Sequence, residues 1–197
     1  MPSQIRNVSL FPYLDDLNRH RLLIPLFQRI VAYCHNIFLI DPASFRLISS
    51  VDPLFYIPCS LLSIFSLRYC ELLQINLTDL TTKKKFLVLQ EKVNTSKEVD
   101  NTVCFDFLNP IKLDLDTPLI CCTYTSLCSA IKKAQFICDI KLRENALCAT
   151  HFFRHAWASW ANYNNLDKEK IRARLGHTSL DSLDAYINSI DFSNITF

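Results

Sequence analysis

The stretch HFFRHAWASWANYNNLDKEKIRARLGHTSLDSLDAYI, residues 151–187, combines an apolar helical stripe with several polar side chains that carry chemistry. Phe153, Trp157 and Trp160 are spaced four and three residues apart, which puts them on one face of a helix. The pattern predicts a helix over residues 147–163 that buries this face.

His151 and Arg154 lie three residues apart in the same predicted helix. They fall on a face beside the apolar stripe, so both side chains can point into one shared site. A His-x-x-Arg pair by itself is more often a surface pair or a satisfied polar contact within a helix.

The residues after this helix carry signals for the ends of two further helices. Asp167 suits the N-cap of a predicted helix over residues 168–175, and Gly176 suits its left-handed C-cap. His177 comes next, on a predicted tight turn. Thr178 and Asp181 have the spacing of a capping box for a last helix over residues 180–190.

Tyr186 lies in that last predicted helix, nine residues after His177. Local pattern alone favours a packing role, because Leu183, Ile187 and Ile190 lie at helical spacing around it.

The first half of the chain reads as helices. Residues 16–34 and 61–75 have helical apolar spacing, and Arg68 and Glu71 are three apart on one face, where they can pair. Asp41-Pro42 and Asp52-Pro53 punctuate the region between these segments.

The apolar period changes after this region. Residues 85–90 and 102–108 predict two strands of a small antiparallel sheet, and residues 124–138 return to helical spacing. The order of elements predicts an α+β class that is predominantly α-helical with a small antiparallel β-sheet.

Composition sets bounds on function. The 197 residues suit one domain, and the single glycine, Gly176, excludes glycine-rich phosphate loops and dinucleotide fingerprints. The nine cysteines form no CxxC pair and mostly sit in apolar runs, which favours reduced thiols in the cytoplasm or nucleus. No apolar run reaches the length of a membrane span, so we expect no membrane partner.

The formal net charge of +2 is weak support for a nucleic-acid partner. Three local clusters, residues 83–85, 132–133 and 168–174, are basic enough to face phosphates. Each is also typical of a solvated charged surface.

The ordered set of motifs points further than any one of them. His151-Phe-Phe-Arg154-His155, Leu175-Gly176-His177 and then Tyr186 together resemble the C-terminal signature of the tyrosine site-specific recombinases, the phage-integrase family. Upstream, Leu67-Arg68-Tyr-Cys-Glu71-Leu72 is similar to the family's first-arginine motif, and Asp79 stands where these enzymes often carry an acidic residue. The resemblance spans residues 61–187 and implies a tyrosine-recombinase-like catalytic domain.

The resemblance also implies roles. Tyr186 would attack a scissile phosphate to give a 3′-phosphotyrosyl intermediate, while Arg68 and Arg154 stabilise charge on the phosphate oxygens. His177 would donate a hydrogen bond to the phosphate, and His151 would assist proton movement at the tyrosine. No metal ion, cofactor or small-molecule substrate is implied.

The family's general-acid lysine is harder to locate. Lys92 follows Arg68 by 24 residues and is the prediction, with Lys97 as the neighbouring alternative. A solvated loop lysine is the other interpretation of each.

The sequence departs from the family pattern at a few positions. Ser66 replaces the usual glycine before Leu-Arg, and Phe153 and Ala156 replace leucine and threonine at packing positions. The family's helical DNA-clamping domain has little room in the sequence. We therefore expect residues 1–50 to be a short helical remnant or end of it and residues 51–197 to be the catalytic domain.

The leading hypothesis is a recombinase or integrase of a mobile element that binds double-stranded DNA and works as a homotetramer on paired sites. The alternatives are activity like that of a type IB topoisomerase or a telomere resolvase, and a non-catalytic architectural DNA-binding protein with the same fold.

Overall fold

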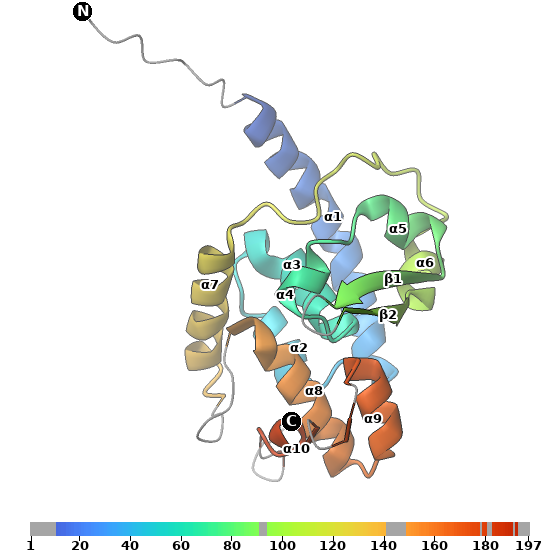
Figure 1. The fold of residues 1–197 in the computed structure, drawn as a ribbon. Helices are drawn as coiled ribbons and strands as arrows, with labels where there is room; N and C mark the ends of the chain where they lie inside the picture. Colours follow the sequence, from blue (N-terminus) through green and yellow to red (C-terminus); the bar gives the residue numbers. More distant parts are fainter. Residues whose placement is uncertain are drawn as a thin grey trace, which may run out of the picture.

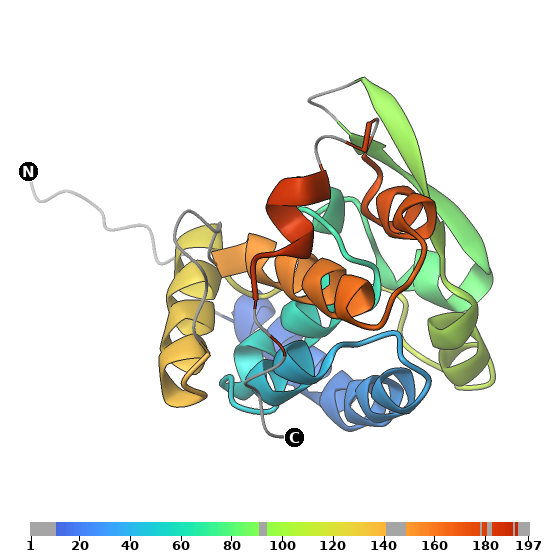
Figure 2. The same cartoon turned by 90° about the horizontal axis from the view of Figure 1, so that it is seen from below.

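The computed structural model describes residues 11–90, 94–140, 149–177, 179–180, 183–190 and 192. Within them, a single antiparallel hairpin lies at one side of the helices, as Figures 1 and 2 show. The predicted α+β class with a predominance of helix is confirmed. The elements are α1 (Phe11–Asn36), α2 (Pro42–Ile48), α3 (Pro53–Ile64), α4 (Tyr69–Leu72), α5 (Leu77–Thr82), β1 (Lys85–Gln90), β2 (Thr95–Asp100), α6 (Thr102–Leu108), α7 (Tyr124–Ile137), the 3-10 turn η1 (Ala149–His151), α8 (Phe152–Tyr163), α9 (Lys168–Leu175) and α10 (Asp184–Ile187).

Helix α8 is the central element. It contacts α2, α3, α9 and α10, and Figure 2 shows it in the middle of the molecule. Phe152, Phe153 and Ala156 are fully buried in the main core, to which α1 contributes Phe27 and Ile30. Trp157 lies in a second, smaller core formed with α9 and α10. The predicted apolar face of this helix is therefore its buried face.

The predicted helix over residues 61–75 is wrong. Instead, α3 ends at Ile64, Ser66 adopts a left-handed conformation with φ of 49°, and the short α4 follows. The missed signal is the Asp-Pro pair: the Asp52 side chain caps α3 by accepting from the Leu54 amide, and proline occupies the first turn. Asp41-Pro42 begins α2 in the same way.

Strand β1 occurs where it was predicted, but its partner is residues 95–100 and not 102–108. Lys97 pairs with Val88 in the antiparallel register. Residues 102–108 form α6, because Cys104 and Leu108, four apart, both face the core. Strand β2 was not predicted because its sequence is mostly polar. Only Lys97 and Val99 face inward and are buried.

The predicted ends of α9 are confirmed. The Asp167 side chain accepts from the Glu169 and Lys170 amides, and Gly176 closes the helix with φ of 68°. The last helix, α10, is shorter than the predicted residues 180–190. The predicted capping pair Thr178 and Asp181 lies outside the described residues.

The eight cysteines of the described part of the chain are all free thiols. Within the same residues, no helix is both long and apolar enough to cross a membrane.

Candidate active site

Arg154 is the centre of a polar cluster inside the protein. It projects from α8, its side chain is fully buried, and its guanidinium donates to the carbonyls of Ser66 (2.6 Å) and Leu175 (2.7 Å). The first carbonyl belongs to the turn between α3 and α4, and the second to the end of α9. Arg154 therefore ties together three segments that are far apart in the sequence.

His177 lies directly against this arginine. Nη2 of Arg154 is 3.2 Å from Nε2 of His177, and because a guanidinium only donates, Nε2 accepts and the ring proton sits on Nδ1. Nδ1 of His177 and Nε of Arg154 are both buried, and neither has a hydrogen-bond partner among the described residues. Two buried N–H donors on this contacting pair of residues therefore have spare hydrogen-bonding capacity.

Tyr186, on α10, packs over the same pair. Its ring centroid is 4.7 Å from that of His177 and 5.7 Å from the Arg154 guanidinium carbon. On its other side the ring stacks on His155, with centroids 4.2 Å apart and an interplanar angle of 8°. The Ser159 hydroxyl donates to the Tyr186 carbonyl at 2.9 Å, which holds the start of this segment on α8.

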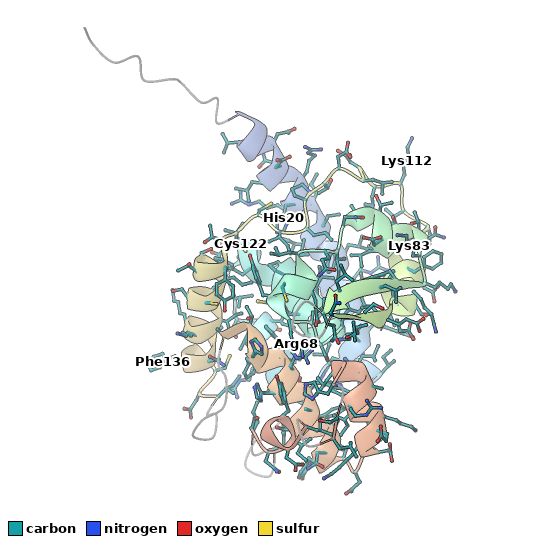
Figure 3. The ribbon with its side chains drawn as sticks, viewed as in Figure 1. His20, Arg68, Lys83, Lys112, Cys122 and Phe136 are labelled. Carbon is teal, nitrogen blue, oxygen red and sulfur yellow. The ribbon has the colours of Figure 1, made fainter. Side chains whose placement is uncertain are left out.

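Arg68 is at the N-cap of α4, and in Figure 3 it lies between α4 and α8. Its Nη1 is 2.8 Å from Oε1 of Glu71, so the predicted pairing of these two residues is confirmed. The Glu71 carboxylate is fully buried and also accepts from the Arg68 amide (3.0 Å) and from Nε2 of Gln90 (3.3 Å).

Lys97 reaches the cluster from β2. It is only 6% exposed, and its Nζ donates to the carbonyls of Phe65 (3.0 Å) and Ser66 (3.1 Å). Its stem passes Gly176, where an added Cβ would come within 3.2 Å of Cδ of Lys97 and within 2.3 Å of Nε2 of Gln90. A glycine is required here by both the positive φ and the lack of space.

The electrostatics of the cluster show an excess of positive charge. Burial, followed by the charges of Arg154 and Arg174, lowers the pKa of Lys97 well below its usual range, and Glu71 only partly opposes this. Burial and then the charge of Arg68 lower the pKa of Arg154. Burial and then Arg154 lower the pKa of His177 to about 4, so this imidazole is neutral at pH 7.

Glu71 responds in the opposite sense. Its burial raises the pKa, but Lys97 and the hydrogen bond from the Arg68 amide outweigh burial, and the pKa is lowered overall. One buried carboxylate therefore faces three cations: Arg68, Lys97 and Arg154. Such an imbalance is suited to an anionic ligand.

The other two predicted site residues are His151 and Lys92. His151 ends the 3-10 turn before α8 and is half-buried; its charge contributes to the low pKa of His155, which is about 4, behind the larger effect of burial. Lys92 lies outside the described residues. The structure brings together Arg154, His177 and Tyr186, with Arg68 near enough to influence the first two electrostatically.

Lys97 was only the alternative prediction for the general-acid lysine, after Lys92, and no role was predicted for His155. The signal for Lys97 was its position two residues before Val99, since alternate residues of a strand face the same side. His155 follows Arg154 directly, and only the packing of α10 gives it a contact with Tyr186.

No known family model matches the sequence, and no curated protein matches it. Solved structures do match. XerH site-specific recombinase, in a post-cleavage complex with palindromic difH substrate, aligns with a TM-score of 0.56 and 17% identity over 77% of this chain and 48% of the XerH chain.

The catalytic domain of bacteriophage HP1 integrase aligns with a TM-score of 0.52 and 21% identity over 73% of this chain and 82% of that domain. The XerA recombinase aligns with a TM-score of 0.51 and 21% identity over 77% of this chain and 57% of XerA. All three are tyrosine recombinases. The fold is that of a tyrosine-recombinase catalytic domain. The chain spans about half the length of the XerH chain that it matches.

The tyrosine-recombinase fold accommodates the departures from the sequence motif. Phe153 and Ala156 are fully buried, as expected for packing positions. Ser66 has a positive φ, the backbone conformation that glycine adopts at least cost.

The basic cluster at residues 83–85 and part of the cluster at 168–174 are paired, whereas Lys132 and Lys133 have no carboxylate partner among the described residues. Each lysine of residues 83–85 has a carboxylate partner, and so do Lys168 and Arg172. The buried cation cluster is therefore a stronger candidate for phosphate binding than these paired surface clusters are.

Proposed function

We propose that this chain cleaves and rejoins DNA strands, with Tyr186 as the nucleophile and a 3′-phosphotyrosyl intermediate. The observation that carries the proposal is a pair of buried donors, Nε of Arg154 and Nδ1 of His177, which lack a hydrogen-bond partner among the described residues and belong to the two side chains beside the Tyr186 ring. A phosphodiester offers non-bridging oxygens to such donors and supplies the negative charge that the cluster lacks.

In the proposed step, Oη of Tyr186 forms a bond to the scissile phosphorus while the bond from phosphorus to the 5′-oxygen breaks. The tyrosine proton leaves with assistance from His151. The arginines Arg68 and Arg154 stabilise the charge that grows on the non-bridging oxygens, and His177 adds a hydrogen bond. Rejoining is the reverse: a 5′-hydroxyl attacks the phosphotyrosine and releases Tyr186.

The departing 5′-oxygen needs a proton, and we propose Lys97 as its donor. Lys97 is buried among the cations of the site, and a lysine whose pKa is lowered is a stronger acid than a solvated one. Lys92 is the competing proposal from the sequence. Cleavage assays on Lys97→Met and Lys92→Met separate the two. A 5′-bridging sulfur leaves as a thiolate without needing a proton, so this substrate should restore cleavage only to the variant that lacks the proton donor.

The proposed partner is double-stranded DNA, since a XerH structure that this fold resembles contains its difH substrate. A homotetramer on paired sites, and the division into residues 1–50 and 51–197, also remain proposals. Because the chain spans about half of XerH, we test chemistry at a single site before recombination.

The experiment needs a DNA site, which selection of bound duplexes from a random library supplies. The enriched sequence is then nicked near the cleavage position, so that the short product diffuses away and the covalent adduct accumulates. Wild type is expected to form an adduct that denaturing gels resolve, and Tyr186→Phe to form none while binding DNA equally well. Tyr163→Phe, an exposed tyrosine on α8, is the matched control and should form the adduct normally.

Three outcomes are informative. Adduct formation by Tyr186→Phe would refute the assignment of the nucleophile. Binding without any adduct from wild type would favour the architectural role. Relaxation of supercoiled DNA without strand exchange between two sites would favour activity like that of a type IB topoisomerase.

A further inference from the structure

Arg174 is a second arginine beneath the site, and its contacts lie away from the proposed phosphate position. It projects from α9, and its Nη2 donates to the carbonyls of Leu39 (2.6 Å) and Ile64 (3.0 Å). Its guanidinium carbon lies 4.0 Å from the centre of the Trp157 ring. Arg174 thus joins α9 to α8, to the end of α3 and to the segment between α1 and α2.

The fourth contact of Arg174 leads to the site itself. Its Nε donates to Oγ of Ser66 at 3.1 Å. The carbonyl of this same serine accepts from Nη1 of Arg154 (2.6 Å) and from Nζ of Lys97 (3.1 Å). Ser66 is therefore held by three cations, one on its hydroxyl and two on its carbonyl.

The conformation of Ser66 makes this contact more than incidental. Its φ of 49° is left-handed, which costs an L-residue roughly 1–2 kcal/mol relative to glycine. Glycine would relieve that cost but has no hydroxyl for Arg174. The hydrogen bond from the charged Arg174 side chain to the serine hydroxyl contributes about 1.5–3 kcal/mol, which offsets the backbone strain.

We propose that Arg174 and Ser66 form a positioning pair, which holds the Ser66 carbonyl where it orients Lys97 and Arg154 for strand cleavage. The inference rests on the proposed function of the site. Neither residue is assigned a contact with DNA. The pair acts through the two cations that it anchors, and a small displacement of that carbonyl shifts both.

Helix α9 also has packing contacts that do not involve Arg174. Ile171 and Leu175 already bury the apolar side of this helix against Trp157. Arg174 adds a second effect on the site, since its fixed charge contributes to the lowered pKa of Lys97 after burial and Arg154. Its own pKa is lowered to about 10 by burial, so it stays charged at neutral pH.

The test compares Arg174→Met and Ser66→Ala with Lys170→Met, an exposed position on the same helix. Single-turnover cleavage of nicked DNA is measured with an ordinary phosphodiester and with a 5′-bridging phosphorothiolate at the scissile position. DNA affinity and the thermal unfolding midpoint are measured in parallel. Arg174→Lys is included because a lysine keeps the charge but loses the planar fork.

We expect Arg174→Met and Ser66→Ala to slow cleavage of ordinary DNA by about 10-fold to 100-fold, the effect of misplacing a catalytic group by a fraction of an ångström to an ångström. DNA affinity should be unchanged. Because the sulfur leaving group needs no proton, the loss on the phosphorothiolate should be several-fold smaller. Arg174→Lys should fall between wild type and Arg174→Met, and Lys170→Met should match wild type.

A Lys97→Met background sharpens the test, since adding Arg174→Met to it should slow cleavage much less than Arg174→Met does in wild type. Equal losses on both substrates, full additivity with Lys97→Met, or wild-type rates in both variants would overturn the inference. If wild type itself forms no adduct, the proposed function fails first. An adduct from wild type with an unaffected Arg174→Met variant refutes the positioning pair alone.

Discussion

The docking of the tyrosine segment onto α8 depends on one buried hydroxyl, that of Ser159. It donates to the Tyr186 carbonyl at 2.9 Å and accepts from the amides of Ser189 (3.0 Å) and Ile190 (3.1 Å). The next polar contact between the same segments joins Nδ1 of His155 and Oγ of Ser189 at 2.5 Å. Replacing Ser159 with alanine removes three hydrogen bonds while keeping the size of the side chain nearly constant.

The magnitude follows from these contacts. A hydrogen bond contributes about 0.5–1.5 kcal/mol net, and a buried amide left without a partner costs about 1–3 kcal/mol. The Ser189 amide keeps a second acceptor, the Tyr186 carbonyl at 3.3 Å, so the Ile190 amide bears most of that cost. We expect Ser159→Ala to weaken docking of α10 by about 2–4 kcal/mol, or about 30-fold to 1000-fold in its opening equilibrium.

Amide hydrogen exchange measures this opening directly. Protection should fall in Ile187, Ser189 and Ile190 but not in α1 or α3, because α10 packs mainly on α8 and opens on its own. Cleavage of a suicide substrate should slow as well, since Tyr186 is docked for a smaller fraction of the time. Ser60→Ala is the control, as the Ser60 hydroxyl only donates to the Tyr56 carbonyl within α3.

Two results would refute the reasoning. One is a loss of protection of less than about three-fold in α10, which would mean that Ser159 contributes little to docking. The other is an equal loss throughout the chain, because opening would then be global and the hydroxyl would serve the whole core.

Further predictions concern the same cluster. Gly176→Ala should slow cleavage and lower the thermal unfolding midpoint, since the added Cβ meets Nε2 of Gln90 at 2.3 Å. Cleavage at the wild-type rate would show that the Gln90 side chain can move aside without affecting the site. Because the pKa values of His155 and His177 are lowered to about 4, the unfolded chain binds protons first as the pH falls from 6.5 towards 4. Urea unfolding should therefore show stability falling with pH in this window by up to about 1.4 kcal/mol per unit for each histidine, and a free energy of unfolding that is flat across it would contradict these shifts. Glu71→Gln should destabilise by about 3–5 kcal/mol because it leaves the buried cations uncompensated, and added phosphate should restore part of the midpoint; no response to phosphate would count against an anion site.

Several features were predictable from the sequence because their causes are local. Asp167 and Gly176 mark the ends of α9 by capping chemistry that involves only neighbouring residues. Strand β1 was predictable as a short run of Phe, Leu and Val, which favours a strand by local composition. Its alternation of buried and exposed residues, with Leu87 and Leu89 exposed and Gln90 buried, depends on its place in the fold. The ordered motif from Arg68 to Tyr186 likewise suggested the fold that the comparisons support.

Other features depend on contacts between distant segments. Strand β2 is polar, and Lys97 is buried because the hairpin places it against the turn at Phe65 and Ser66. Asn101, just after it, is buried because its amide donates to the carbonyls of Leu80 (3.0 Å) and Lys83 (2.6 Å), contacts that direct the chain into α6 where a strand was predicted.

Some residues of the candidate site were likewise predictable from the sequence, and others were not. The sequence supplied the arginines, the histidines and the tyrosine by their order along the chain. The tertiary structure decided that Lys97 contacts the Phe65 and Ser66 carbonyls, that His155 stacks on Tyr186, and that Arg174 bonds to the Ser66 hydroxyl. Spacing along the chain determines which residues share a helix face or cap a helix. It carries no information on which carbonyl a buried cation finds across 88 residues, as Arg154 finds that of Ser66.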